Sequence, residues 1–390
     1  MSTDCAQLEA CFRDKGPAAA LEMLENQMRS AGDHTGWFYT LLMKARQNLG
    51  IAPTPTAPAE EIPPGLHEQY EEAIRAAGRT VGNAALEKGQ LEAAWQMFKL
   101  LGEPEPVRSA LLAKTLGDDD DWELPIRLAY YEGLAPETGF DWILRRYGLC
   151  NAITTLSQET PGGPETRQHC LRALVRAIRA ELMRRLRSDL RHRQGLPQAE
   201  TEEELGPPPA LGEIRRLLDQ HPELTEEDSY HIDLSHLQST VQLSSQLTAC
   251  PERALARELC DYGKRLKGRF VPRGEPPFED FFGGWDRVLA ALEGDRPDDH
   301  IAFFREQALA AAAEGNPYPA EVWLDLLRKL GRDREALEAA AICQSPAALR
   351  GSCNELKDFR PMREAARRQE DRVHFLAALL EQRNLEPRAR

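Results

Sequence analysis

Residues 82–98 read GNAALEKGQLEAAWQMF, a pattern that predicts two short helices folded back on each other at Gly89. The small residues Gly82 and Ala94 stand where the two helix backbones have to approach closely. The apolar contacts between the helices are expected from Leu86, Leu91, Met97 and Phe98. Such a hairpin is a stackable unit, and the rest of the chain has the pattern of similar units, so the sequence predicts an all-α fold.

The composition agrees with a helical, soluble protein. At 390 residues the chain exceeds one simple core, so two domains or an extended repeat array are expected. Apolar residues make up 42% and charged residues 29%, as in soluble globular proteins. Ala, Leu, Glu and Arg dominate and favour helices. Alternating runs of Val, Ile and Thr are nearly absent, so little sheet is expected.

The charge and the cysteines limit the class of partner and the compartment. A net charge of −14 disfavours general binding to nucleic acid or anionic membranes, because both need a basic surface. Eight dispersed cysteines without a CxxC pair indicate reduced thiols. The polar, acidic start is unlike a signal peptide, and no apolar run approaches the roughly 20 residues of a membrane span. We therefore expect a cytoplasmic protein without a membrane partner, and no cofactor is indicated.

The predicted helices fall into two lobes. The N-terminal lobe is expected at 1–195 and the C-terminal lobe at 210–390, separated by a Pro/Glu-rich linker at 196–209. The longest helix is expected from Glu165 to Gln194, where leucines recur at helical spacing. A further helix is expected at about 226–248.

The long predicted helix carries many arginines on its polar faces. They are Arg167, Arg172, Arg176, Arg179, Arg184, Arg185, Arg187, Arg191 and Arg193. One interpretation is ion pairing with acidic segments of the same chain. The other is a docking face at 167–193 for an acidic partner or RNA. The missing interleaved aromatic residues weigh against single-stranded RNA, so nucleic acid is the less favoured partner.

Residues 75–104 resemble a tetratricopeptide repeat, a family with small residues in its first helix, a glycine turn, alanine in its second helix, and then an aromatic residue and a proline. The matching residues are, in order, Gly82, Leu86, Gly89, Ala94, Phe98 and Pro104. A weaker match at 320–341 has Val322, Trp323, Leu327, Leu330, Gly331, Ala336 and Ala340, and a partial match at 11–28 has Gly16, Ala20 and Leu24. The resemblance implies antiparallel helical hairpins stacked as an α-solenoid.

The same resemblance implies a function in binding proteins or peptides. Members of the family usually bind peptides in a groove lined by the first helices, and in many a basic residue and an Asn four positions later hold the partner. Arg79 and Asn83 fall on these two positions. Residues four apart share a helix face, so both side chains could reach one ligand. The expected function is a non-catalytic adaptor or scaffold; the alternative for these two residues is a solvated helix face.

His231, Asp233 and His236 are the candidate metal ligands, because two imidazoles and a carboxylate within six residues could bind Zn²⁺ or another divalent ion. An extended segment would point His231 and Asp233 the same way. One continuous helix would instead put the two histidines about 140° apart and prevent a shared metal. A structural alternative makes Asp233 a helix N-cap, with Ile232 and Leu237 as its hydrophobic staple.

Residues 147–155, YGLCNAITT, contain the candidate nucleophile Cys150. His231 or His236 could activate its thiol if the fold brought them together. The alternative is that Cys150 is a small buried hydrophobic residue. P-loop, GxGxxG, GxSxG and HExxH motifs do not occur in the sequence. The sequence therefore favours a binding protein, with a metal-dependent enzyme as the alternative.

Overall fold

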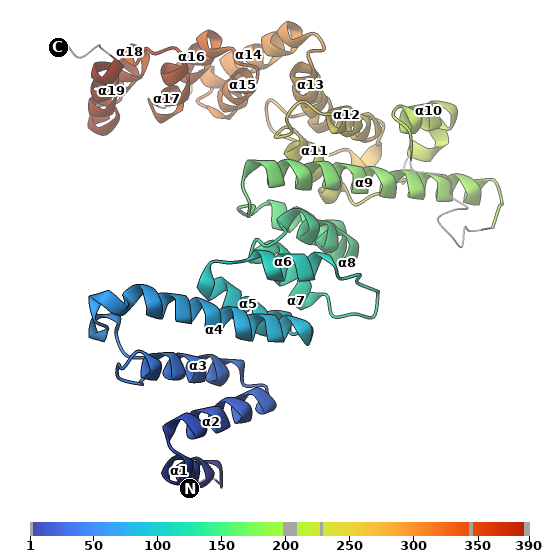
Figure 1. The fold of residues 1–390 in the computed structure, drawn as a ribbon. Helices are drawn as coiled ribbons and strands as arrows, with labels where there is room; N and C mark the ends of the chain where they lie inside the picture. Colours follow the sequence, from blue (N-terminus) through green and yellow to red (C-terminus); the bar gives the residue numbers. More distant parts are fainter. Residues whose placement is uncertain (1–2, 198–208, 227–228, 343–345, 386–390) are drawn as a thin grey trace. The chain divides into compact units, whose positions relative to one another are not determined.

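The structure is a computed structural model (Figure 1). It describes residues 3–197, 209–226, 229–342 and 346–385. These residues form helices joined by turns and loops, and their only strand-like pairing is an isolated bridge between Arg273 and Asp280. The predicted all-α fold is therefore confirmed.

The chain divides into two compact units, Met1–Trp142 and Ile143–Arg390. The division falls in the sequence of helix α8 (Pro136–Leu156). The linker predicted at 196–209 lies almost entirely outside the described residues. The domain boundaries expected at 1–195 and 210–390 therefore stay a prediction.

The first unit consists of helices that pack on their neighbours in the sequence. Their bounds are α1 (Thr3–Lys15), α2 (Pro17–Ala31), α3 (His34–Asn48), α4 (His67–Glu87), α5 (Leu91–Leu101), α6 (Glu105–Leu112) and α7 (Glu123–Ile126), followed by a π-helical turn η3 (Arg127–Tyr131). Each helix from α1 to α5 packs against the one that follows it. This nearest-neighbour packing is typical of helical solenoids.

The hairpin of α4 and α5 has the turn and the close approach that the sequence predicts. Gly89 lies between the two helices with a φ of +72°, a left-handed conformation that glycine adopts readily. A Cβ atom on Gly82 would lie 2.7 Å from the ring of Phe98. Ala94 and Phe98 are both buried. The missing side chain at Gly82 therefore leaves the space that the Phe98 ring of α5 occupies against α4.

The second unit begins within α8 and continues to the end of the described residues. Its further helices are α9 (Pro164–Arg193), α10 (Glu213–Gln220), α11 (Leu234–Ser244), α12 (Glu252–Gly263), α13 (Phe281–Glu293), α14 (Pro297–Ala313), α15 (Tyr318–Lys329), α16 (Asp333–Ile342), α17 (Pro346–Glu355), α18 (Arg360–Arg368) and α19 (Arg372–Leu385). The helix α9 matches the predicted long helix to within one residue at each end. From α11 onward each helix packs on the next, and α13 and α14 also contact the second helix along, as in stacked hairpins.

The two weaker repeat-like stretches also form hairpins. The helices α1 and α2 pack together across Gly16, which has a φ of +86°. The helices α15 and α16 pack together across Gly331, which has a φ of +68°. Helical hairpins of this kind occur in several repeat families, so they establish helical repeats without singling out the tetratricopeptide type.

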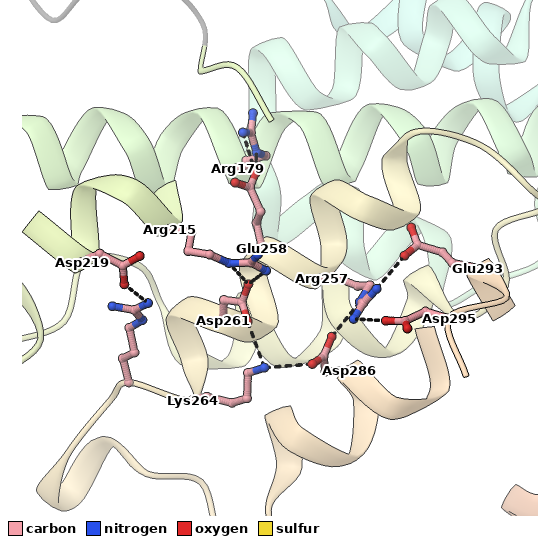
Figure 2. Close-up of polar contacts among 11 residues, drawn as sticks. Arg179, Arg215, Asp219, Arg257, Glu258, Asp261, Lys264, Asp286, Glu293 and Asp295 are labelled. Carbon is pink, nitrogen blue, oxygen red and sulfur yellow. Dashed lines mark hydrogen bonds and ion pairs between the residues drawn. The ribbon is translucent and has the colours of Figure 1, made fainter. Parts of the chain in front are cut away.

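A chain of ion pairs joins α9, α10, α12 and α13 (Figure 2). Its members are Arg179–Glu258, Arg215–Asp261, Lys264–Asp261, Lys264–Asp286 and Arg257–Asp286, with Arg257 also paired to Glu293 and Asp295. The helix α12 supplies a residue to every one of these pairs except Lys264–Asp286, in which Lys264 is the C-cap residue that follows α12. Isolated surface ion pairs stabilise little, whereas a partly buried network such as this one fixes several helices together.

The start of α11 differs from the expected helix at 226–248. The helix begins at Leu234, because the carboxylate of Asp233 accepts hydrogen bonds from the backbone N–H groups of Ser235, at 2.8 Å, and His236, at 3.3 Å. Ile232 and Leu237 are buried on either side of the cap. The single long helix was therefore wrong, and the N-cap alternative is confirmed.

Candidate functional site

A surface pocket of about 630 Å³ in the second unit brings together residues from separate segments of the chain. It is lined by Leu144, Tyr147, Gly148, Leu149, Cys150, Ala177, Glu181, Arg185, Tyr230, Ile232, Asp233 and His236. We call it the Cys150 pocket. Its walls come from the C-terminal half of α8, from α9 and from the segment that leads into α11. The volume lies in the range of pockets that hold small ligands or parts of a peptide.

A break in α8 shapes the first wall of the pocket. Gly148 has a φ of 75° and a ψ of −171°, which interrupts the helix and is a conformation that glycine tolerates best. The four successive residues from Tyr147 to Cys150 all line the pocket. Tyr147 and Cys150 are three residues apart and would share a face even on an unbroken helix, whereas four consecutive residues would not, so the break at Gly148 explains why Gly148 and Leu149 line the pocket as well.

One face of α9 forms the second wall. Ala177, Glu181 and Arg185 lie four residues apart and therefore share this face. Glu181 accepts hydrogen bonds from Arg184, at 2.7 Å, and from Arg185, at 2.5 Å. Burial acts to raise the pKa of Glu181, but the hydrogen bonds from the two arginines lower it overall. The pocket therefore presents a fixed, ionised carboxylate beside a guanidinium.

The third wall of the pocket is the segment that leads into α11, with Tyr230, Ile232, Asp233 and His236. His231 lies within this segment and holds it in place through buried hydrogen bonds. Its backbone N–H donates to the hydroxyl of Tyr262 at 2.8 Å, and its Nδ1 lies 3.2 Å from the same oxygen. Its Nε2 lies 3.1 Å from Oδ2 of Asp189. Burial lowers the pKa of His231, although Asp189 acts in the opposite direction. The buried imidazole therefore fixes the segment before α11 between α9 and α12.

Two tyrosines stand exposed at the pocket, Tyr147 with 45% and Tyr230 with 52% of its surface accessible. The ring of Tyr230 packs against Phe270 with a centroid distance of 4.6 Å. Phe270 in turn lies beside the guanidinium of Arg269. The Tyr230 ring is thus supported on one side while much of its surface faces solvent.

The three predicted metal ligands have separate roles in this arrangement. His231 bonds to Asp189 and Tyr262, Asp233 caps α11, and His236 lines the pocket. Within the described part of the chain, no group of three or more His, Cys, Asp and Glu side chains is placed where it could hold a metal ion. The geometry supports the structural alternative for Asp233, and metal binding stays a prediction.

The structure brings Cys150 and His236 to the same pocket, but His231 does not join them. Cys150 is exposed, so it is not the buried hydrophobic residue of the alternative interpretation. Among the hydrogen bonds of the described residues, none connects its thiol to His236. A thiol without a bonded base lacks the arrangement of an activated nucleophile.

Arg79 and Asn83 lie on α4 in the first unit, and both are exposed. The guanidinium of Arg79 donates to both carboxylate oxygens of Glu103, at 2.8 and 2.9 Å. Glu72 lies 3.6 Å from the same guanidinium. The hydrogen bonds that Arg79 donates to Glu103 raise the pKa of Arg79. A partner carboxylate would have to replace Glu103, and the role of this pair in binding stays a prediction.

The arginines of α9 are mostly paired within the chain. Eight of the nine make hydrogen bonds or ion pairs: Arg167 with Gln246, Arg176 with Glu252, Arg179 with Glu258, Arg184 and Arg185 with Glu181, Arg187 with Glu213, Arg191 with the carbonyl of Pro197, and Arg193 with Asp189. These contacts favour the intramolecular interpretation over an RNA-docking face.

The sequence pointed to Cys150, Asp233 and His236 but missed the contribution of α9 to the pocket. Arg185 was one of the nine arginines of the possible docking face at 167–193, whereas Glu181 looks like an ordinary polar position of an amphipathic helix. Only their spacing of four residues marks them as one face, and nothing local indicates what that face meets.

Comparisons with known proteins do not assign the chain to a family. No protein-family model matches the chain, and neither does any curated protein. The chain is similar to a solved structure described as a "Circular tandem repeat protein with novel repeat topology and enhanced subunit contact surfaces", with 17% identity and a TM-score of 0.18 over 98% of this chain and 82% of that one. None of the helices in the described ranges is both long and apolar enough to cross a bilayer.

Proposed function

We propose that this chain is a non-catalytic helical-repeat scaffold of the tetratricopeptide-like type, which binds a segment of a protein partner at the Cys150 pocket in the cytoplasm. The observation that carries the proposal is the pair of exposed tyrosines, Tyr147 and Tyr230, at one pocket that also holds Arg185. Tyrosine and arginine are the residue types that contribute most often to binding energy at protein interfaces.

The pocket is also ordered before a partner arrives. Tyr230 packs on Phe270, Glu181 is held by Arg184 and Arg185, and Asp233 is fixed as a helix cap. A binding surface whose side chains are already fixed loses less conformational entropy on association. This preorganisation supports recognition by a formed surface and does not require a chemical step.

The test starts from a displayed library of random peptides selected on the full chain. Selected peptides are then measured by fluorescence polarisation against the wild type and the variants Tyr147→Ala and Tyr230→Ala. Each substitution should weaken binding about thirtyfold, the effect of losing one hot-spot side chain of about 2 kcal/mol. Tyr318→Ala is the matched control, since Tyr318 is 42% exposed in the same unit and outside the pocket.

Peptides that bind both variants as tightly as the wild type would contradict the proposal, as would a failure to select any peptide. Mass spectrometry of the selected peptides after incubation tests the enzymatic alternative at Cys150. Unchanged peptides agree with a scaffold, whereas cleavage of more than one equivalent of peptide that disappears in Cys150→Ser would establish catalysis instead.

Arg79 and Asn83 are proposed as a second contact in the first unit. The substitutions Arg79→Ala and Asn83→Ala should each weaken the binding of peptides that carry an acidic group or a free C-terminus. The variant Glu103→Gln should strengthen the binding of the same peptides, because it removes the internal carboxylate that competes for Arg79.

A further inference from the structure

A second surface pocket, of about 400 Å³, lies in the C-terminal part of the second unit. It is lined by Arg328, Arg350, Gly351, Asn354, Phe359 and Glu381. These residues come from three alternate helices, α15, α17 and α19, and from the N-cap position of α18. We call it the Arg328 pocket. It shares no residue with the Cys150 pocket.

Two guanidinium groups from different helices meet at this pocket. The guanidinium of Arg328 lies against the backbone of α17 at Gly351. A Cβ atom built on this glycine would be 3.5 Å from Nη2, 3.7 Å from Cζ and 3.8 Å from Nε of Arg328. A side chain longer than that of alanine would therefore occupy the place of the guanidinium. Arg350 directly precedes Gly351 and lines the same pocket, so α15 and α17 each supply one accessible positive charge.

The other two polar side chains of the lining are those of Asn354 and Glu381. Asn354 is exposed, and its side-chain amide can donate hydrogen bonds. Nη2 of Arg350 donates to Oε1 of Glu381 at 3.3 Å, and the two side chains are 69% and 39% exposed. A long, exposed ion pair of this kind contributes little stability. An external anion can therefore compete with Glu381 for Arg350.

The helices that carry these groups are held together within the unit. From α15 to α19 each helix packs on the next. The side chain of Phe359 is buried, and its backbone N–H donates to Oε1 of Gln382 on α19 at 2.8 Å. The backbone frame of the pocket is therefore formed without a ligand, which reduces the entropy lost on binding.

The charge of the lining indicates the class of ligand. Two arginines and one glutamate give the lining a net charge of +1, which a single negative charge neutralises. The planar guanidinium matches a carboxylate, which accepts two parallel hydrogen bonds from it. A phosphate group with about two negative charges would bring excess negative charge close to Glu381.

We propose that Arg328 and Arg350 bind one carboxylate group between them, with the side-chain amide of Asn354 as a further donor. The ligand class is a monocarboxylate, carried either by a free organic acid or by a side chain or C-terminus of a peptide. This site does not depend on the function proposed for the Cys150 pocket.

Isothermal titration of the full chain at low ionic strength tests the proposal. The acids are sodium butyrate, acetylated trialanine with a free C-terminus, and an acetylated, amidated tripeptide with a central glutamate. Their neutral counterparts are butyramide, amidated trialanine and the tripeptide with a central glutamine. We expect at least one acid to bind, and its counterpart to bind at least about tenfold more weakly, because it offers no anion to the guanidinium groups.

The pattern of binding separates the two sources of the carboxylate. Binding of butyrate shows that a free acid is sufficient, whereas binding of the peptide acids alone assigns a peptide ligand. Inorganic phosphate is the further probe. Phosphate that binds more tightly than every acid would overturn the assignment to a carboxylate.

Variants of the lining test which residues hold the acid. Arg328→Met and Arg350→Met should each weaken binding at least about tenfold. Arg360→Met is the matched control, because Arg360 is 72% exposed and outside the lining, and it should leave binding unchanged. Glu381→Gln should strengthen binding about two- to fivefold, since it frees Arg350 from its exposed ion pair.

The gain expected for Glu381→Gln cannot arise from impaired folding, so it tests the site even if an arginine variant is unstable. The proposal is overturned if no acid binds the wild type, if acids and their neutral counterparts bind alike, or if Glu381→Gln fails to strengthen binding. Failure at this site would leave the tyrosine test of the Cys150 pocket unaffected.

Discussion

Glu258 and Arg179 form a buried ion pair between α12 and α9, with Oε2 of the glutamate 2.7 Å from Nε and 2.6 Å from Nη2 of the arginine (Figure 2). The two side chains are 3% and 5% exposed. The arginine also donates to the carbonyl oxygens of Pro209 and Ala210. This pair therefore connects α9, which carries one wall of the pocket, to α12, the helix that takes part in most of the other ion pairs.

Removing one partner of this pair should destabilise the second unit strongly. Glu258→Ala leaves a buried guanidinium without its anion, and we expect the free energy of unfolding to fall by about 3–5 kcal/mol. Urea unfolding followed by circular dichroism measures the change. The double variant Arg179→Met/Glu258→Leu should recover much of the loss, since it leaves no unpaired charge.

The exposed pair Arg305–Glu338 provides the control for that measurement. Its side chains are 50% and 48% exposed, so Glu338→Ala should change the free energy of unfolding by less than about 1 kcal/mol. Equal effects of the two alanine substitutions would mean that burial of the Arg179–Glu258 pair has no energetic consequence.

Stability should fall as the pH decreases from about 7 to 5. Burial lowers the pKa of His231 in the folded state, and the same cause lowers that of His300. In this window the unfolded chain, with an ordinary histidine pKa near 6.5, binds protons that the folded chain does not, so acid favours unfolding. The stability that these two histidines contribute is fully present above the histidine pKa of the unfolded chain. It is lost as the pH falls from there towards their lowered pKa in the folded chain.

Urea unfolding at a series of pH values tests this, with His231→Gln and His231→Gln/His300→Gln as variants. Each substitution should flatten the dependence between pH 5 and 7. The carboxylates with lowered pKa, such as Asp189 and Glu181, titrate at lower pH and should leave this window unaffected. An unchanged slope in the double variant would contradict the assignment to these two histidines.

Gly82→Ala should destabilise the first unit by about 1–2 kcal/mol. The added Cβ would lie 2.7 Å from the ring of Phe98, which is 1% exposed and has no room to move. This overpacking should outweigh the gain in helix propensity of alanine over glycine. Gly65→Ala is the matched control, because a Cβ there meets no atom within 4 Å; thermal unfolding of both variants decides whether the close approach of α4 and α5 limits this position.

Purified protein should contain no stoichiometric metal. The ring nitrogens of His231 face Asp189 and Tyr262, and Oδ1 of Asp233 accepts hydrogen bonds at the start of α11, so two of the three predicted ligands already have partners within the chain. Metal analysis of tag-free protein should give the same low content for the wild type and for His231→Ala/His236→Ala. About one equivalent of metal that disappears in the double variant would restore the predicted metal site.

Several local features followed from the sequence because they depend on short-range geometry. Helical spacing of apolar residues predicted α9 nearly to its ends, and the glycine at position 89 marked the turn between α4 and α5. The cap at Asp233 was one of two alternatives, since an Asp before an apolar run favours an N-cap but does not exclude a longer helix.

At Arg46 the helical spacing and the residue type predict opposite environments. Phe38, Leu42 and Arg46 follow one another at intervals of four residues on one face of α3, and all three are buried. The spacing indicates burial, but the charge of an arginine ordinarily indicates a solvated position. The residue type therefore predicts exposure and the spacing predicts burial. Which of the two is right depends on whether a neighbouring helix packs over the position, and the sequence does not show this.

The sequence by itself therefore determined the all-α class, the long helix α9 and the hairpin turn at Gly89, because these depend on backbone conformation and on the spacing of neighbouring residues. The tertiary structure alone decided which side chains meet across helices. Asp189 and His231 are 42 residues apart, and Tyr147 and Tyr230 come from separate segments, yet each pair shares one site. Helical periodicity shows which face of a helix is apolar, whereas the partner of that face is selected by packing and by the pairing of buried charges.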